Sequence, residues 1–116
     1  MGTLQGHEAE DRASVYLEAQ GLQIIARNWR NRWCEIDIVA QGKDTIHIVE
    51  VKYRARSQWG GAAEYVTPDK IERLRRAATA WQQANRYGGS IQIDVVAIEG
   101  TSEEPTITWL TNVVLD

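Results

Sequence analysis

Two strand-like runs joined by a short polar turn constrain the fold more than any other feature of the sequence. Residues 33–40 and 45–53 are rich in isoleucine and valine, and residues 41–44 between them include Gly42. β-Branched runs on either side of a turn that contains glycine predict an antiparallel hairpin. Centring the turn between Gly42 and Lys43 sets which residues of the two strands lie opposite each other.

Polar side chains break the apolar pattern of this hairpin. Glu35 and Asp37 lie on the first strand, and the second strand carries Glu50 and Lys52. Because side chains alternate between the faces of a strand, each of these pairs shares a face. With the turn as centred, Glu35 lies opposite Glu50. Asp37 then lies opposite Ile48, and all four polar side chains fall on the same side of the sheet.

The other segments complete the element order αβββαββ. Residues 7–20 repeat apolar side chains at helical spacing. A second helix begins at Thr67–Pro68, because threonine is a good N-cap and proline suits the first helical position, and we expect it to end at Gly88–Gly89. Further strands are expected at residues 22–30, 91–98 and 106–110, with a loop over 55–63. This order predicts one α/β domain over residues 1–116, with a mixed β-sheet flanked by helices.

Composition excludes several classes of protein. Cys34 is the single cysteine, which excludes an intrachain disulfide and a cysteine-rich zinc site and favours a cytoplasmic location. The sequence starts without the basic and then apolar order of a signal peptide. No apolar run approaches the ~20 residues of a membrane span. His47 falls on the apolar face of the hairpin, where we expect it to be packed or at the sheet edge.

The distribution of charge favours a polyanionic partner, although the net charge of −3 does not. Residues 27–86 carry twelve of the thirteen lysines and arginines and have a net charge of +5. This asymmetry predicts a basic surface on an acidic body. The alternative is that these side chains only form the solvated face of one helix and its neighbours.

The carboxylates of the hairpin predict a metal site. Like charges that lie side by side on a sheet repel, so a compensating cation is expected. Lys52 is one such cation, and a Mg²⁺ or Mn²⁺ ion held by Asp37 and Glu50 would be the other, since hard ions prefer carboxylate and carbonyl oxygens. Such an ion activates water and stabilises charge on a phosphoryl group, and Lys52 beside it can orient or deprotonate the water. The alternative is an ordinary surface hairpin with Glu–Lys cross-strand pairs.

Asp37 followed by Glu50-Val51-Lys52 resembles the PD-(D/E)xK nuclease signature. Over nearly its whole length the chain resembles the YraN family of small bacterial proteins, which have a restriction-endonuclease-like fold. The stretches that carry this resemblance are residues 9–13, 26–30, 35–39, 49–54, 66–70 and 94–98. The resemblance implies a restriction-endonuclease-like mixed sheet flanked by helices. It also implies hydrolysis of DNA phosphodiester bonds with Mg²⁺ or Mn²⁺.

The same resemblance implies a set of site residues. Asp37 and Glu50 would hold the metal together with the backbone carbonyl of Val51. Glu10 matches a glutamate that archaeal Holliday-junction resolvases of this superfamily place on their first helix near the metal. Glu35 would support the site by hydrogen bonding or by holding a second metal.

Basic residues near the hairpin and the second helix predict a path for a nucleic-acid backbone, most simply that of DNA. The predicted contacts are Arg54, Arg56, Lys70, Arg73 and Arg76. No helix-turn-helix, zinc-finger or RNA-recognition signature is present, which favours recognition of shape, such as branched or junction DNA. A homodimer with twofold symmetry would suit a two-armed junction.

Two other functions stay open at this point. A binding module without turnover would use the same basic surface as an accessory in repair or recombination, with metal-independent and strongly salt-dependent binding. A scaffold protein would fit the acidic flanks and would show no affinity for nucleic acid. A mere binder has no need to cluster carboxylates beside its phosphate path, so this clustering favours the nuclease.

Overall fold

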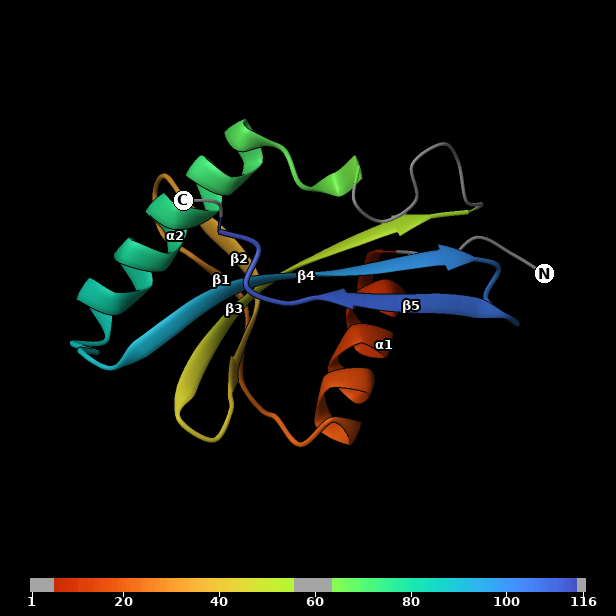
Figure 1. Ribbon diagram of the computed structural model, residues 1–116, viewed down its shortest axis with the longest axis horizontal. Helices are drawn as coiled ribbons and strands as arrows, with labels where there is room; N and C mark the ends of the chain where they lie inside the picture. Colours follow the sequence, from red (N-terminus) through yellow and green to blue (C-terminus); the bar gives the residue numbers. More distant parts are fainter. Residues whose placement is uncertain (1–5, 56–63, 115–116) are drawn as a thin grey trace.

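The structure is a computed structural model that describes residues 6–55 and 64–114, and its elements follow the predicted order αβββαββ (Figure 1). The bounds are α1 (Gly6–Ala19), β1 (Gln23–Arg30), β2 (Glu35–Gln41), β3 (Thr45–Arg54), α2 (Pro68–Ala84), β4 (Ser90–Gly100) and β5 (Pro105–Leu110). Arg56 and the rest of the predicted loop up to residue 63 lie outside the described residues. Neither described helix is long and apolar enough to cross a membrane.

The five strands form one mixed sheet in the order β1-β2-β3-β4-β5. β3 and β4 are parallel, while the other three neighbouring pairs are antiparallel. A parallel pair needs a crossover connection, and the segment that contains α2 supplies it between β3 and β4. The predicted fold class, a mixed α/β sheet flanked by helices, is confirmed.

The two helices cover opposite faces of the sheet. α1 packs Ala13 and Leu17 against Val49 of β3, whereas α2 packs Leu74 against Ile48 of the same strand. Adjacent residues of a strand point to opposite faces, so each helix takes the side chains of one parity. Figure 1 shows α1 and α2 on the two sides of the strands.

The start of α2 is as predicted, and its end is not. The side-chain oxygen of Thr67 accepts a hydrogen bond from the backbone N–H of Lys70, and Pro68 is the first helical residue. The helix ends at Ala84, several residues before Gly88–Gly89, because Asn85 caps it and turns its side-chain amide back onto a helix carbonyl. An asparagine in this role is a local signal that the glycine pair obscured.

The turn between β2 and β3 lies one residue later than predicted. The N–H of Gly42 donates to the carbonyl of Thr45 at 2.8 Å, so the turn consists of Lys43 and Asp44 alone. A β-carbon on Gly42 would lie 2.8 Å from Nε2 of His47, which leaves room only for glycine. This close packing and the tight loop together displace the centre of the hairpin.

The later turn shifts the register of the hairpin by two residues. The predicted pairing of Asp37 with Ile48 and of Glu35 with Glu50 is therefore wrong, and Ile48 pairs with Val39 instead. A shift of two residues preserves which side chains share a face. Continued beyond the last paired residues, the observed register places Asp37 directly opposite Glu50.

A buried carboxylate ties together β3, β4 and the segment after β5. Asp94 is fully buried and accepts hydrogen bonds at 2.7 to 2.9 Å from Nδ1 of His47, Nε2 of Gln92, Nε1 of Trp109 and the backbone N–H of Asn112. His47 is thus packed, as expected for the apolar face, but its partner is a carboxylate. Four donors satisfy the buried charge, which makes this cluster a structural anchor of the sheet.

Candidate functional site

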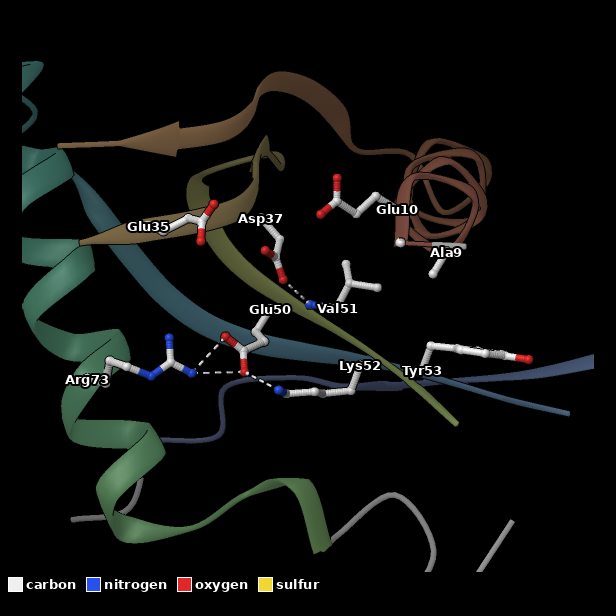
Figure 2. A pocket seen from close by; sticks show the side chains of 10 residues that line it. Ala9, Glu10, Glu35, Asp37, Glu50, Val51, Lys52, Tyr53 and Arg73 are labelled. Atoms are coloured by element: carbon white, nitrogen blue, oxygen red, sulfur yellow. Dashed lines mark hydrogen bonds and ion pairs between the residues drawn. The ribbon is translucent and has the colours of Figure 1, made fainter. Parts of the chain in front are cut away.

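β2 and β3 separate at one end of the sheet, and a cleft forms there. Their last backbone pair is Ile38 with Val49, whereas β1–β2 pairing continues to Glu35 and β3–β4 pairing continues to Arg54. The cleft has a volume of about 450 Å³ and we call it the β2–β3 cleft (Figure 2). The charged side chains that line it are Glu10, Glu35, Asp37, Glu50, Lys52 and Arg73.

The structure therefore brings together every side chain that was predicted to be catalytic. Glu35 and Asp37 come from β2, Glu50 and Lys52 come from β3, and Glu10 enters from the first turns of α1. Figure 2 shows Asp37 between Glu10 on one side and Glu50 on the other. Residues from three separate elements thus meet where the sheet divides.

Asp37 occupies the centre of the β2–β3 cleft and has an unusual pKa. Its Oδ2 accepts the backbone N–H of Val51 at 2.8 Å, in place of the strand carbonyl that is missing at the separation. Burial raises the pKa of Asp37 from 3.8 to about 6, against the lowering effect of this hydrogen bond. The carboxylates of Glu50, Glu10 and Glu35 raise it further. Burial and the neighbouring carboxylates therefore both disfavour the charged form of Asp37.

Glu50 is buried and is surrounded by three cations. Nη2 of Arg73 donates to both of its carboxylate oxygens, at 3.0 and 3.1 Å. Nζ of Lys52 lies 3.5 Å from Oε2, and Nζ of Lys70 lies 3.6 Å from the same oxygen. Burial lowers the pKa of Lys70, and the positive charge of Lys52 lowers it further. Arg73 was predicted as a DNA contact, and the sequence held no sign that it would bind Glu50.

Glu10 and Glu35 are held at the two sides of the cleft. Oε1 of Glu10 accepts a hydrogen bond from Nδ2 of Asn28 at 3.1 Å and lies 3.6 Å from Nη2 of Arg27. Glu35 is exposed and pairs with Arg30 at 3.2 Å. Both carboxylates therefore have partners from β1, and neither touches Asp37 directly through a hydrogen bond in the described residues.

Comparisons with known proteins give the chain a family. The profile of the uncharacterised protein family UPF0102 matches residues 9–98. The chain belongs to this family. A UPF0102 protein of Shewanella loihica is 42% identical over 108 residues, covering 93% of this chain and 91% of the relative. A UPF0102 protein of Pseudomonas putida is 40% identical over 113 residues, covering 95% and 91%. UPF0102 is the YraN family that the sequence resembles, so this resemblance is confirmed at the level of the family.

The donor atoms in the cleft of this UPF0102 protein are oxygens, which are the atoms that a hard divalent ion prefers as ligands. Asp37, Glu50 and Glu10 offer carboxylate oxygens, and Val51 adds a backbone carbonyl. Among the described residues, however, no three His, Cys, Asp or Glu side chains converge closely enough to hold a metal. The contacts of Glu50 explain this, because its carboxylate is turned toward Arg73 (Figure 2).

The basic residues predicted to contact DNA have different surroundings. Lys70 and Arg73 lie beside the cleft through their contacts with Glu50. Arg54, the last residue of β3, pairs with Glu64 at 3.1 Å and covers the ring of Tyr65. Arg76 pairs with Glu72 on the exposed side of α2 and does not line the cleft. Of the predicted contacts among the described residues, Lys70 and Arg73 therefore lie beside the cleft and Arg76 does not.

Proposed function

We propose that this UPF0102 protein is a metal-dependent endonuclease that hydrolyses DNA phosphodiester bonds, with branched or junction DNA as a candidate substrate. The observation that carries the proposal is the crowding of Asp37 by three further carboxylates beside Lys52. A carboxylate with a pKa raised by burial and by neighbouring carboxylates inside a cleft is typical of a functional site. The placement of Asp37 and the Glu50-Val51-Lys52 run at a strand separation also agrees with the PD-(D/E)xK resemblance.

The metal would be Mg²⁺ or Mn²⁺. Asp37, Glu50 and the carbonyl of Val51 would hold it, with Glu10 completing the outer side. When bound, the ion would supply an activated water and would stabilise charge on the phosphate. Holding it requires the carboxylate of Glu50 to leave Arg73, and the exchange of one cation for another keeps the buried charge compensated.

Lys52, Arg73 and Asp37 each have a separate role in the proposed reaction. The side chain of Lys52 is 38% exposed and ends at the cleft, so its ammonium group can orient a water or offset the charge of a phosphate oxygen. Arg73 is half exposed, and once released from Glu50 its planar guanidinium can bind a phosphate with two hydrogen bonds. Asp37 holds the β3 backbone at Val51 and so fixes the Val51 peptide at the cleft.

Lys52→Ala is expected to lower the rate of DNA cleavage by about 100-fold, because one positioned donor that stabilises developing charge contributes that order of rate. The measurement is cleavage of linear, forked and four-way-junction DNA with Mg²⁺ or Mn²⁺. The matched control is Lys43→Ala, which removes an exposed lysine from the turn at the far end of the same hairpin. Equal cleavage by wild type and Lys52→Ala would contradict the role of this lysine.

A second candidate function is a nucleic-acid-binding module without turnover. The specific observation in its favour is the neutralisation of Glu50 by Arg73, Lys52 and Lys70, which gives a compensated site with no need of a metal. Under this alternative, DNA binding would be the same in EDTA and in Mg²⁺, would fall steeply with salt, and would lead to no cleavage.

A further inference from the structure

The turn between β1 and β2 displays an exposed aromatic side chain next to the candidate site. Trp33 was expected at the start of the second strand, but residues 31–34 form a turn, and Trp33 is 81% exposed at its tip. Tryptophan is normally buried over most of its surface, because it loses favourable free energy when its large ring stays in water. An exposure of this size requires an explanation.

The turn is held in one shape by the side chain of Asn31. Its Oδ1 accepts the backbone N–H groups of Trp33 at 2.8 Å and of Cys34 at 2.7 Å. The backbone N–H of Asn31 donates to the carbonyl of Cys34 at 2.9 Å and closes the turn. An asparagine that binds its own following backbone rigidifies a turn. Trp33 is therefore presented in a defined position.

Positive charge surrounds this ring. The guanidinium of Arg32 lies 5.4 Å from the centre of the Trp33 ring, a cation–π contact, and among the described residues it has no carboxylate partner. Arg30 and Arg73 line a groove of about 310 Å³ that also contains Trp33. This groove and the β2–β3 cleft share Glu35 and Arg73, so the two hollows adjoin each other.

We propose that this turn binds an unpaired nucleotide of single-stranded DNA, with the base stacked on Trp33 and the phosphate held by Arg32. The proposal rests on the proposed function for its choice of DNA. A ring can stack on an internal base only when the base is out of the duplex, because the neighbouring base pairs cover both of its faces. Because the groove at Trp33 adjoins the β2–β3 cleft, the substrate would be DNA with a single-stranded segment beside the bond to be cut.

The test is the affinity of labelled DNA measured by fluorescence anisotropy in EDTA. Trp33→Leu is expected to bind a single-stranded oligonucleotide on the order of tenfold more weakly than wild type, the usual range for one lost base stack. Binding of a blunt duplex should change by less than about twofold. Trp33→Tyr should recover most of the lost affinity, because it keeps a ring. Ile25→Ala, which trims an exposed apolar residue of β1, should bind as wild type does.

The salt dependence of binding separates base stacking on Trp33 from the phosphate contact of Arg32. Trp33→Leu should leave the slope of affinity against salt concentration unchanged, whereas Arg32→Ala should reduce it by about one ion. Single-strand affinity of Trp33→Leu equal to wild type would overturn the proposal, as would Trp33→Tyr binding no better than Trp33→Leu. The proposal would also be overturned if wild type is a dimer and Trp33→Leu is a monomer, because the ring would then be a contact between subunits.

Cleavage assays of the same variants keep this inference apart from the proposed function. If wild type and Asp37→Asn are equally inactive but single-strand binding depends on Trp33, the nuclease assignment fails and the binding site stands. If cleavage depends on Asp37 but single-strand binding is unaffected by Trp33→Leu, the nuclease assignment stands and the binding site is overturned.

Discussion

Asp37→Asn is expected to lower DNA cleavage on the order of a thousandfold while making the metal-free protein more stable. The loss of activity follows because the amide cannot supply the negative charge that holds a divalent ion at the centre of the cleft, and such an ion contributes several kcal/mol to the reaction. The gain in stability follows because the charged form of Asp37 is disfavoured in the fold by burial and by three neighbouring carboxylates.

The stability that wild type loses through Asp37 depends on pH. Asp37 has a pKa of about 6 in the folded protein against 3.8 as a free side chain. The folded state therefore binds the proton more tightly, and stability that is present below pH 3.8 is lost as the pH rises through about 6. The loss amounts to about 2 kcal/mol, after allowance for the part of the carboxyl that water reaches. Asp37→Asn should not show this loss.

The measurements are cleavage at pH 7.5 with Mg²⁺ or Mn²⁺ and chemical unfolding in EDTA at pH 4 and pH 7.5. The matched control is Asp44→Asn, the same change at the exposed turn of the same hairpin, and it should alter neither quantity. Cleavage by Asp37→Asn within tenfold of wild type would contradict the catalytic role. A metal-free Asp37→Asn protein that is less stable than wild type at pH 7.5 would show that the charge of Asp37 does not destabilise the fold.

Asp94→Ala is expected to lower the free energy of unfolding by about 4 kcal/mol, the largest stability effect that we predict. Removing the fully buried carboxylate leaves half-buried donors on His47, Gln92 and Trp109, and the Asn112 backbone N–H, without their acceptor. Buried donors that lose their partner cost about 1 to 3 kcal/mol each, and loss of one member of a buried charged network costs about 3 to 5.

Denaturant unfolding at neutral pH measures this change. The control is Glu72→Ala, which removes an exposed carboxylate from α2 and should change the free energy of unfolding by less than about 0.5 kcal/mol. A loss below about 1 kcal/mol for Asp94→Ala would mean that the cluster does not anchor β4 and the segment after β5. The β2–β3 cleft lies elsewhere on β3, so DNA binding by the folded fraction should persist.

Local features of this protein were predictable from its sequence because they depend on nearby residues. Thr67 and Pro68 mark the start of α2 through their own backbone preferences, and the structure begins the helix there. The shared face of Asp37, Glu50 and Lys52 follows from the alternation of a strand, which a register shift of two residues does not change. The hairpin turn was misplaced by one residue, because the hydrogen bond that closes it depends on packing that a sequence does not show.

Contacts between distant elements were not predictable in this way. Arg73 binds Glu50 across 23 residues of sequence, and only the packing of α2 on β3 brings them together. His47 and Asp94 meet because β3 and β4 are parallel neighbours. Trp33 could have been placed in a turn, since Asn31 before it is a turn-forming residue. The carboxylates of the site and Lys52 beside them were thus visible in the sequence, but the contacts of Lys70 and Arg73 with Glu50 were not.

Crystals soaked in Mn²⁺ would show whether the β2–β3 cleft binds a divalent ion. We predict an anomalous-scattering peak between Asp37 and Glu50, in contact with the Val51 carbonyl, with the guanidinium of Arg73 moved away from Glu50. Soaked crystals in which Arg73 still binds both oxygens of Glu50, and in which no peak lies at Asp37, would contradict this prediction.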